Sequence, residues 1–415
     1  MTSEHVARDA TAEGQSPRTI AWFSYFPVEW LPDALSEIRA LPRLHPASWQ
    51  RVLLDALQQQ RPELHLHVIA LRKELSRSQV FQRHNATFHV LKVPGGWRGP
   101  SLFWLDTLLI GRLVRRLKPD LLHAWGTEKG AAWVAKRLGR PHLITVQGLY
   151  SWLREIGPLN VYERLAARAE RRCLPAATLV TTESTFSACY VRDHFPGTTV
   201  MQIEHAPAPL FHQVERRPRR SPRRFLFVGY FGERKGVDLL LRALNGLVGQ
   251  EQFDLVMVGP PREPLHGQLR AELSPQLWQR VVFKQQLTAT EVAGELAEAT
   301  LLIYPTRADV SPNTVKEAVV AGVPVVASAV GGIPDYVVPG ENGILFPPGQ
   351  VEACARAIRE ACAHPLFGQG QVNPRTLERM RAYLSPDTMG RRFWEAYQRV
   401  WQQSRRAPLP RGSAS

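Results

Sequence analysis

The sequence YPTRADVSPNTVKEAVVAGVPVVASAVGGIPD, residues 304–335, combines a strand end, an acidic loop, a helix, a second strand and a glycine turn. Ser311 and Pro312 are expected to be the N-cap and first residue of the helix, because serine accepts an unpaired backbone N–H and proline has none to lose. Asp309 precedes this point and Glu317 lies inside the helix. A positive helix end flanked by carboxylates suits a phosphate together with sugar or ribose hydroxyls.

Apolar, strand-like runs alternate with amphipathic helical segments along most of the chain. The second half contains RFLFVG, FDLVMVG, RVVF, TLLIYP and VPVVAS. The first half contains TIAWFSYF, LHLHVIAL, TFHVLKV, DLLHAW, HLITV, ATLVTT and TVMQI. Such alternation predicts parallel sheets with helices on both faces. We therefore expect an α/β protein with two Rossmann-like domains.

The length of 415 residues also favours two domains, because it exceeds what one hydrophobic core usually supports. The expected organisation is a disordered tail at 1–17, a first domain at 18–206, a basic Pro/Arg linker at 207–222, a second domain at 223–385 and a helix at 386–405 that packs back on the first domain. Ligands of open sheets bind beyond the carboxyl ends of the strands, so two facing sheets predict one interdomain cleft.

The chain is strongly basic. Its 52 Lys and Arg against 37 Asp and Glu give a formal net charge of +15, which favours an anionic partner such as a phosphorylated substrate or a membrane surface. No nucleic-acid motif is evident, so we expect no nucleic-acid binding. Four cysteines without metal-ligand spacing indicate a reduced, intracellular protein.

No apolar run is long enough to span a bilayer, and residues 1–17 lack the apolar core of a signal peptide or anchor. The nearest segment, SLFWLDTLLIGRLVRRL, is expected to be an amphipathic helix buried through Leu102, Leu105, Leu109 and Leu113. We expect a cytoplasmic location, with peripheral attachment to the inner face of the membrane as an option.

Several motifs of the second half resemble retaining family 4 glycosyltransferases of GT-B fold. They are VGYFGERKGVDLLLRAL, ADVSPNTVKEA with the preceding YPT, AGVPVVAS and GGIPDYVVPGENGILFPPG. In the first half, PDLLHAWGTEKG and HLITVQGLYSW are similar to a subset of that family.

The resemblance implies a donor site on the second domain. Asp309 would contact the donor sugar, Glu317 would hold the ribose hydroxyls, and Lys235 with Arg234 would neutralise the diphosphate. The residues implied in catalysis are Asp309, Glu317 and Lys235, and those implied in donor binding are Gly229, Arg234, Lys235, Ser311, Asn313, Thr314 and Glu317.

The acceptor-side candidates follow two strands of the first domain: His123, Gly126, Thr127, Glu128, Gln147 and Gly148. His123 fits a packed core position as well as a substrate-side one. The turn at Gly331 and Gly332 fits either a plain turn or a close approach of the backbone to a ligand.

The sequence departs from the family pattern at four places. Asp309 stands where Glu is usual, Tyr230 where an Arg commonly follows the glycine, and Gln147 where many members have a sugar-contacting His. The usual Gly-Gly loop after the first strand is missing, and residues 26–28 occupy that region.

The implied function is retaining transfer of a sugar from a nucleotide-diphosphate donor to a carbohydrate or lipid-linked acceptor, in cell-surface polysaccharide or glycolipid synthesis. No DxD-type metal motif stands out, so the reaction is expected to need neither metal nor cofactor. A sugar-nucleotide epimerase of the same fold and a non-catalytic sugar-nucleotide-binding protein remain alternatives. Trp97, Trp104 and Trp152 are aromatic candidates for contact with a membrane.

Overall fold

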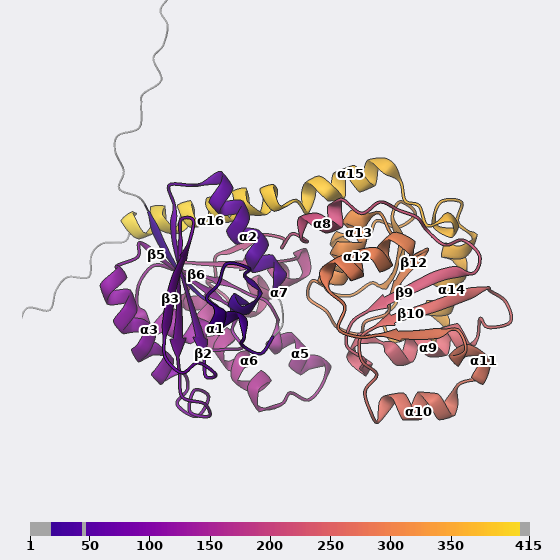
Figure 1. Cartoon of the computed structure of the whole chain (residues 1–415), viewed down its shortest axis with the longest axis horizontal. Coiled ribbons are helices and arrows are strands. Elements are labelled where there is room, and N and C mark those ends of the chain that lie inside the picture. Colours follow the sequence, from indigo (N-terminus) through magenta and orange to yellow (C-terminus); the bar gives the residue numbers. More distant parts are fainter. Residues whose placement is uncertain (1–17, 44–46, 407–415) are drawn as a thin grey trace, which may run out of the picture.

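The computed structural model describes residues 18–43 and 47–406, so the tail expected at 1–17 lies outside the described residues. Two α/β domains lie side by side (Figure 1), each built on a sheet with helices on both faces. This arrangement confirms the expected fold class.

The described part of the first domain contains an eight-stranded sheet of order β3-β4-β2-β1-β5-β6-β7-β8. Its strands are β1 (Thr19–Phe23), β2 (His65–Arg72), β3 (Gln79–Arg83), β4 (Ala86–Lys92), β5 (Leu121–Trp125), β6 (His142–Thr145), β7 (Leu179–Thr182) and β8 (Val200–Gln202). Its helices are α1 (Ser36–Arg39), α2 (Ser48–Gln60), α3 (Trp104–Leu117), α4 (Ala131–Leu138), α5 (Tyr150–Ile156), α6 (Val161–Cys173) and α7 (Thr185–His194).

One strand of this sheet is antiparallel and was not predicted from the sequence. β3 pairs antiparallel with β4 at the edge of the sheet, while the other strands run parallel. An edge strand needs an apolar side chain on one face only, so QVFQR carries little of the apolar signal that marks the buried strands.

The second domain contains a six-stranded parallel sheet of order β11-β10-β9-β12-β13-β14. Its strands are β9 (Arg223–Val228), β10 (Phe253–Val258), β11 (Val281–Lys284), β12 (Leu301–Tyr304), β13 (Val325–Ser328) and β14 (Gly343–Phe346). Its helices are α9 (Val237–Asn245), α10 (Leu265–Glu272), α11 (Pro275–Trp278), α12 (Ala289–Glu298), α13 (Asn313–Ala321), α14 (Val351–Ala363) and α15 (Pro374–Tyr383). Short 3₁₀ turns lie at Val28–Trp30, Leu174–Ala176, Glu233–Lys235, Ile333–Asp335 and Phe367–Gln369.

The segment at 207–222 contains the short helix α8 (Pro209–His212) and is partly held against the second domain. The Arg216 guanidinium donates to the carbonyls of Ala297, Ala299 and Gly370. Burial lowers the pKa of Arg216 to about 10. Arg216 therefore contributes to the fold and is not available to a partner.

The last helix, α16 (Pro386–Arg406), runs back along the first domain beside α2 (Figure 1). Its buried face repeats at helical spacing and joins the first-domain core through Met389, Phe393, Ala396, Tyr397, Val400 and Trp401. The Tyr397 hydroxyl accepts a hydrogen bond from Trp22 Nε1 at 3.1 Å. The chain thus crosses the domain boundary twice.

The start of α13 differs from the expected one. The helix begins at Asn313, with Pro312 in an extended N-cap conformation that has no side-chain cap. The Ser311 hydroxyl lies 2.9 Å from the Tyr336 hydroxyl instead. The prediction of a serine cap at Ser311 is wrong, because Tyr336, which follows the 3₁₀ turn Ile333–Asp335, bonds to the serine oxygen.

Candidate functional site

The loop after β9 presents Lys235 beside the carboxyl end of β12. Glu233–Lys235 forms a 3₁₀ turn that ends at Gly236, whose φ is 71°. A Cβ at Gly236 would lie 1.8 Å from the Pro305 carbonyl oxygen, so only glycine allows this approach. The Lys235 side chain is therefore held over the end of β12.

Lys235, Tyr304 and Asp309 form one hydrogen-bonded group. Lys235 Nζ donates to the Tyr304 hydroxyl at 2.6 Å and forms an ion pair with Asp309 Oδ2. The Tyr304 hydroxyl donates to the same carboxylate oxygen at 2.9 Å. Burial raises the pKa of Tyr304 well above its usual value, so this phenol stays a donor. Asp309, expected to contact the donor sugar, and Lys235, expected to neutralise the diphosphate, thus pair with each other.

The glycine turn after β13 supports the Asp309 loop. Gly331 has a φ of 57°, and a Cβ there would lie 1.7 Å from the Asp309 carbonyl oxygen. A Cβ at Gly332 would lie 2.4 Å from the Val310 carbonyl oxygen. The two glycines therefore allow a close approach to the backbone of residues 309 and 310. This contact fixes the loop that carries Asp309.

Glu317 lies half-buried on α13 and makes no hydrogen bond or ion pair with any other described residue. Burial raises its pKa to about 7, although the neighbouring Lys316 cation works in the opposite direction. On the preceding turn, the Thr314 hydroxyl donates to the Val228 carbonyl at 3.3 Å and ties α13 to the end of β9. Glu317 is thus an unpartnered carboxylate with free capacity to accept hydrogen bonds.

A cavity of about 250 Å³ lies between the two domains. Ser311 and Asn313 line it from the second domain, and Glu128 and Gln147 line it from the first. Its other lining residues are Tyr25, Ala47, Trp49, Gln50, Trp125, Lys129 and Glu183, none of which was selected from the sequence. Tyr25 and Trp125 end or follow a strand, and that position could have identified them.

The loop after β5, which holds several of the acceptor-side candidates, is closed by a hydrogen bond between neighbouring residues. Gly126 adopts a φ of 81°, and the Thr127 amide donates to Glu128 Oε2 at 2.8 Å. Burial raises the pKa of Glu128. With the Gln147 amide oriented to satisfy its neighbours, its nitrogen donates to Glu128 Oε1 at 3.2 Å and its oxygen accepts from Trp49 Nε1 at 3.0 Å. Glu128 and Gln147 therefore form one polar wall of the interdomain cavity.

The remaining acceptor-side candidates do not line this cavity. His123 is fully buried, with Nδ1 2.9 Å from the Tyr397 hydroxyl and Nε2 2.7 Å from the Thr145 hydroxyl. Burial holds the pKa of His123 well below its usual value. Gly148 lies against the Tyr150 ring. The contacts of His123 are those of a core histidine that anchors α16.

A buried ion pair joins the domains at the wall of the cavity, which Glu183 lines. Lys316 Nζ lies 3.1 Å from Glu183 Oε2, and His205 Nδ1 lies 3.1 Å from Glu183 Oε1. Burial acts to raise the pKa of Glu183, but His205 and Lys316 outweigh it and bring that pKa down to about 2. Beside this pair, the Thr185 amide donates to Asp335 Oδ2 across the boundary at 2.7 Å. Lys316 is the neighbour of Glu317, so the pair also fixes the helix that carries Glu317.

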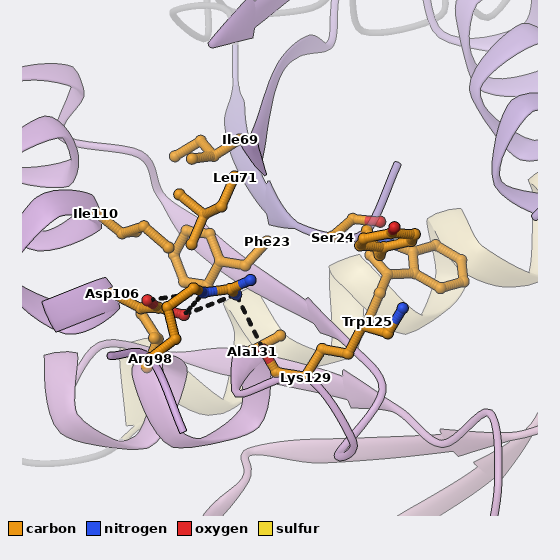
Figure 2. Close-up of a pocket in the computed structure, with 12 residues that line it drawn as sticks. Phe23, Ser24, Ile69, Leu71, Arg98, Asp106, Ile110, Trp125, Lys129 and Ala131 are labelled. Carbon is orange, nitrogen blue, oxygen red and sulfur yellow. Dashed lines mark hydrogen bonds and ion pairs between the residues drawn. The ribbon is translucent and has the colours of Figure 1, made fainter. Parts of the chain in front are cut away.

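A second cavity, of about 540 Å³, opens in the first domain and shares Tyr25, Glu128 and Lys129 with the interdomain cavity. Beside it lies a small cavity of about 30 Å³. Figure 2 shows how Arg98, one of its lining residues, reaches Asp106. Arg98 Nη2 donates to Asp106 Oδ2 at 2.8 Å and to the Lys129 carbonyl at 3.4 Å. These bonds fasten the loop before α3 to the acceptor-side loop.

Within residues 18–43 and 47–406, no group of three or more His, Cys, Asp or Glu side chains is placed to hold a metal ion. Over the same residues, no helix combines the length and the apolar character needed to cross a bilayer.

Two family models match the chain. Residues 222–364 match "Glycosyl transferases group 1" and residues 50–203 match "Glycosyltransferase Family 4". Similar proteins include sulfoquinovosyl transferase SQD2 of Arabidopsis thaliana, which is 26% identical over 59% of this chain and 50% of that protein. The GDP-mannose-dependent alpha-mannosyltransferase of Corynebacterium glutamicum is 31% identical over 63% of this chain and 64% of that protein. The matches thus span about half of SQD2 and under two thirds of the mannosyltransferase.

Similar solved structures span nearly the whole chain. Sucrose-phosphate synthase from Thermosynechococcus elongatus has a TM-score of 0.76 at 20% identity, covering 93% of this chain and 100% of that one. Anabaena HepE, solved with UDP-glucose, has a TM-score of 0.63 at 16% identity, covering 92% and 99%. These likenesses confirm the expected GT-B fold.

Proposed function

Because the chain belongs to the family 4 glycosyltransferases, we propose that it transfers a sugar from a nucleoside diphosphate sugar to an acceptor hydroxyl with retention of configuration. The observation that supports this proposal best is the interdomain cavity, which is walled by strand-end residues of both domains. The donor binds to the second domain and the acceptor to the first, and the reaction serves cell-surface polysaccharide or glycolipid synthesis.

In the proposed reaction, the bond between the sugar C1 and the diphosphate oxygen breaks, and the acceptor oxygen forms a bond to C1 on the same face. The acceptor proton passes to the departing diphosphate oxygen, so no protein nucleophile is needed. Lys235 and Arg234 supply the positive charge that stabilises the leaving group. Asp309 orients Lys235 and accepts hydrogen bonds from the donor sugar, while Glu317 accepts them from the ribose.

Incubation with a panel of nucleotide sugars tests this function. We expect an acceptor-dependent glycoside and a free nucleoside diphosphate, and we expect the reaction to persist in a chelator because the protein cations take the place of a metal. An altered sugar nucleotide formed without an acceptor would favour the epimerase instead. Binding without turnover for every donor and acceptor tried would favour a non-catalytic binding protein.

Replacing Glu317 by glutamine is expected to weaken nucleoside diphosphate binding about tenfold at pH 8, because ribose hydroxyls donate more strongly to a carboxylate than to an amide. The pKa of Glu317 is about 7, so wild-type affinity should rise as the pH increases through 7. The Glu317→Gln variant should lack this rise. Calorimetric titration of UDP and GDP between pH 6 and about pH 8 measures both effects.

The same substitution has an opposite effect on stability. The folded-state pKa of Glu317 lies above the unfolded value, so ionisation of Glu317 destabilises the folded protein. This destabilisation is absent at low pH and reaches its full size above pH 7. Glu317→Gln should therefore raise the free energy of unfolding at pH 8 by on the order of 1 to 3 kcal/mol. Equal stability of both proteins at pH 8 and at pH 5 would contradict the raised pKa.

An apolar rim lies on or beside the segments that line the larger first-domain cavity, and it supports a lipid-linked acceptor. We define the rim by its exposed side chains, which are Trp97, Leu102, Trp104, Leu108, Ile156, Val161 and Tyr162. Trp97 is 69% exposed and Tyr162 is 71% exposed. Tyr162 itself lines the cavity, as do Gly96 next to Trp97 and Phe103 next to Leu102 and Trp104. Trp152 is buried, so the expectation that it belongs to an exposed surface is wrong.

Much of this rim exists because α3 is rotated about its axis relative to the orientation expected from the sequence. Its buried face contains Asp106, Ile110 and Val114, whereas the leucine stripe expected to be buried is only half-buried or exposed. The reason is the entry to the helix, where Leu102 and Phe103 adopt positive φ and the Phe103 ring lies against Gly130. α3 thus keeps apolar side chains on its outer face, and the exposed Arg112, Arg115 and Arg116 follow them along the helix. Apolar residues followed by arginines suit an anionic bilayer.

Replacing Trp97 and Trp104 together by serine is expected to lower binding to anionic vesicles about tenfold, because two interfacial anchors are lost. Co-sedimentation with phosphatidylcholine vesicles, with and without phosphatidylglycerol, measures the bound fraction. The control variant, Val80→Ser with Val282→Ser, removes exposed apolar side chains outside the rim and should bind as the wild type does. Binding that is equal for both vesicle types, or dimerisation through the rim, would contradict a membrane partner.

A further inference from the structure

Three cations converge on one aromatic ring at the carboxyl end of β9. Arg234 Cζ lies 5.6 Å from the centroid of the Tyr230 ring, Lys235 Nζ lies 5.8 Å from it, and Arg262 Cζ lies 5.5 Å from it. Arg234 Nε also donates to the Tyr230 hydroxyl at 2.8 Å. Arg262 comes from a different loop, the one that follows β10. The sequence motifs did not identify it.

Two glycines allow the loops to meet around Tyr230. Gly259, which follows β10, has a φ of 145°, and a Cβ there would lie 2.1 Å from the Gly229 carbonyl oxygen. A Cβ at Gly232 would lie 2.7 Å from Cε2 of the Tyr230 ring. The backbones at the ends of β9 and β10 are therefore in contact, which brings Arg262 to the ring.

Among the described residues, this group of three cations has one carboxylate as an ion-pair partner, that of Asp309. Lys235 pairs with Asp309, but neither the Arg234 nor the Arg262 guanidinium has a carboxylate within ion-pair distance among the described residues. Like charges placed together disfavour one another, and a ring face offsets only part of that cost. Two uncompensated guanidinium groups beside Lys235 therefore suit a ligand with at least two negative charges.

We propose that Arg262 is a third cation of the donor diphosphate site and that Tyr230 is the positioning residue of this group. The proposal rests on the proposed function, because it concerns the same donor. The Tyr230 hydroxyl holds Arg234, and the Tyr230 ring holds Arg262 at a distance that allows both guanidinium groups to face the diphosphate. Arg262 thereby sets the affinity for the phosphates and makes no contribution to recognition of the base.

Replacing Arg262 by alanine is expected to lower the affinity for UDP or GDP about tenfold, because one charge-assisted contact to the diphosphate is lost. Affinity for uridine or guanosine should be unchanged, since these probes carry no phosphate. In the transfer assay kcat/KM for the donor should fall by at least a similar factor. The matched control is Arg270→Ala, which should bind as the wild type does. Arg270 is an exposed arginine on α10 whose guanidinium lies 4.9 Å from the centroid of the Trp278 ring.

Two further variants separate the roles of Tyr230. Tyr230→Phe keeps the ring and removes only the hydroxyl that holds Arg234, so it should weaken diphosphate binding about threefold. That loss should vanish in an Arg234→Ala background. Tyr230→Arg introduces a guanidinium at the same strand end, so it should restore part of the binding to the Arg262→Ala protein, less what the loss of the Tyr230 hydroxyl costs.

The outcomes distinguish this inference from the proposed function. If the wild type binds UDP or GDP and Arg262→Ala binds equally well, the role of Arg262 is wrong while the proposed function stands. An equal loss of nucleoside and diphosphate affinity in Arg262→Ala would also overturn it, because the effect would not concern the phosphates. If the wild type binds and turns over no nucleotide in the panel, the proposed function itself fails.

Discussion

Replacing Lys235 by alanine is expected to lower kcat/KM about 100- to 1,000-fold, the usual cost of losing one preorganised group that stabilises charge in a transition state. The ammonium group is mostly buried and already oriented by Tyr304 and Asp309. Its position therefore does not have to be established when the donor binds. Negative charge on the diphosphate grows as the bond to C1 breaks, so most of the loss should appear in kcat.

The comparison with two other variants makes this prediction specific. Lys235→Arg retains the charge but not the geometry at the Tyr304 hydroxyl, and it should recover part of the rate. Lys284→Ala removes a lysine of the same domain that pairs with Glu295 at 2.5 Å, and it should leave turnover unchanged. Turnover of Lys235→Ala at the wild-type rate would refute the catalytic role assigned to this residue.

Replacing Lys316 by methionine is expected to reduce the free energy of unfolding by about 3 kcal/mol, because it leaves the buried Glu183 carboxylate with one partner instead of two. Lys316 is fully buried, and its ammonium lies 3.1 Å from Glu183. His205 would remain as the other partner of Glu183. Guanidinium chloride denaturation measures the change, and Lys118→Met, at an exposed lysine, serves as the control.

The double variant Glu183→Gln with Lys316→Met tests the cause of this loss. It removes both charges, so it should recover most of the stability that the single variant loses. The pKa of Glu183 is about 2, below the unfolded value, so the pair contributes stability above the unfolded pKa and loses it as the pH falls towards 2. Lys316→Met should therefore show a weaker dependence of stability on acid pH. A double variant as unstable as Lys316→Met would show that the charges are not responsible.

The architecture of the second domain could be predicted from the sequence, and its candidate site residues could be named from their motifs. Short-range periodicity marks parallel strands and helices, and the motifs around Asp309 and Glu317 lie within a few residues of one another. The motif VGYFGERKGVDLLLRAL likewise indicates Lys235. The structure brings Lys235 to Asp309, 74 positions further along the chain, because β9 and β12 are neighbours in the sheet.

Other features depend on interactions that no local pattern encodes. β3 carries little apolar signal because it is an edge strand, and Ser311 bonds to Tyr336 instead of capping α13. The rotation of α3 follows from contact between Phe103 and Gly130 on separate segments. Each of these outcomes required the competing partner to be placed in space.

The sequence by itself determined the fold class and the family, and it proposed Asp309, Glu317 and Lys235 as site residues, because local order and spacing encode the strands, helices and motifs. Only the tertiary structure decided which charged groups lie close enough to interact. Glu183 meets Lys316 across 133 positions, and Arg262 meets Tyr230 from a neighbouring loop. Electrostatic interaction depends on distance and burial, and both are set by the packing of the two sheets and of the two domains.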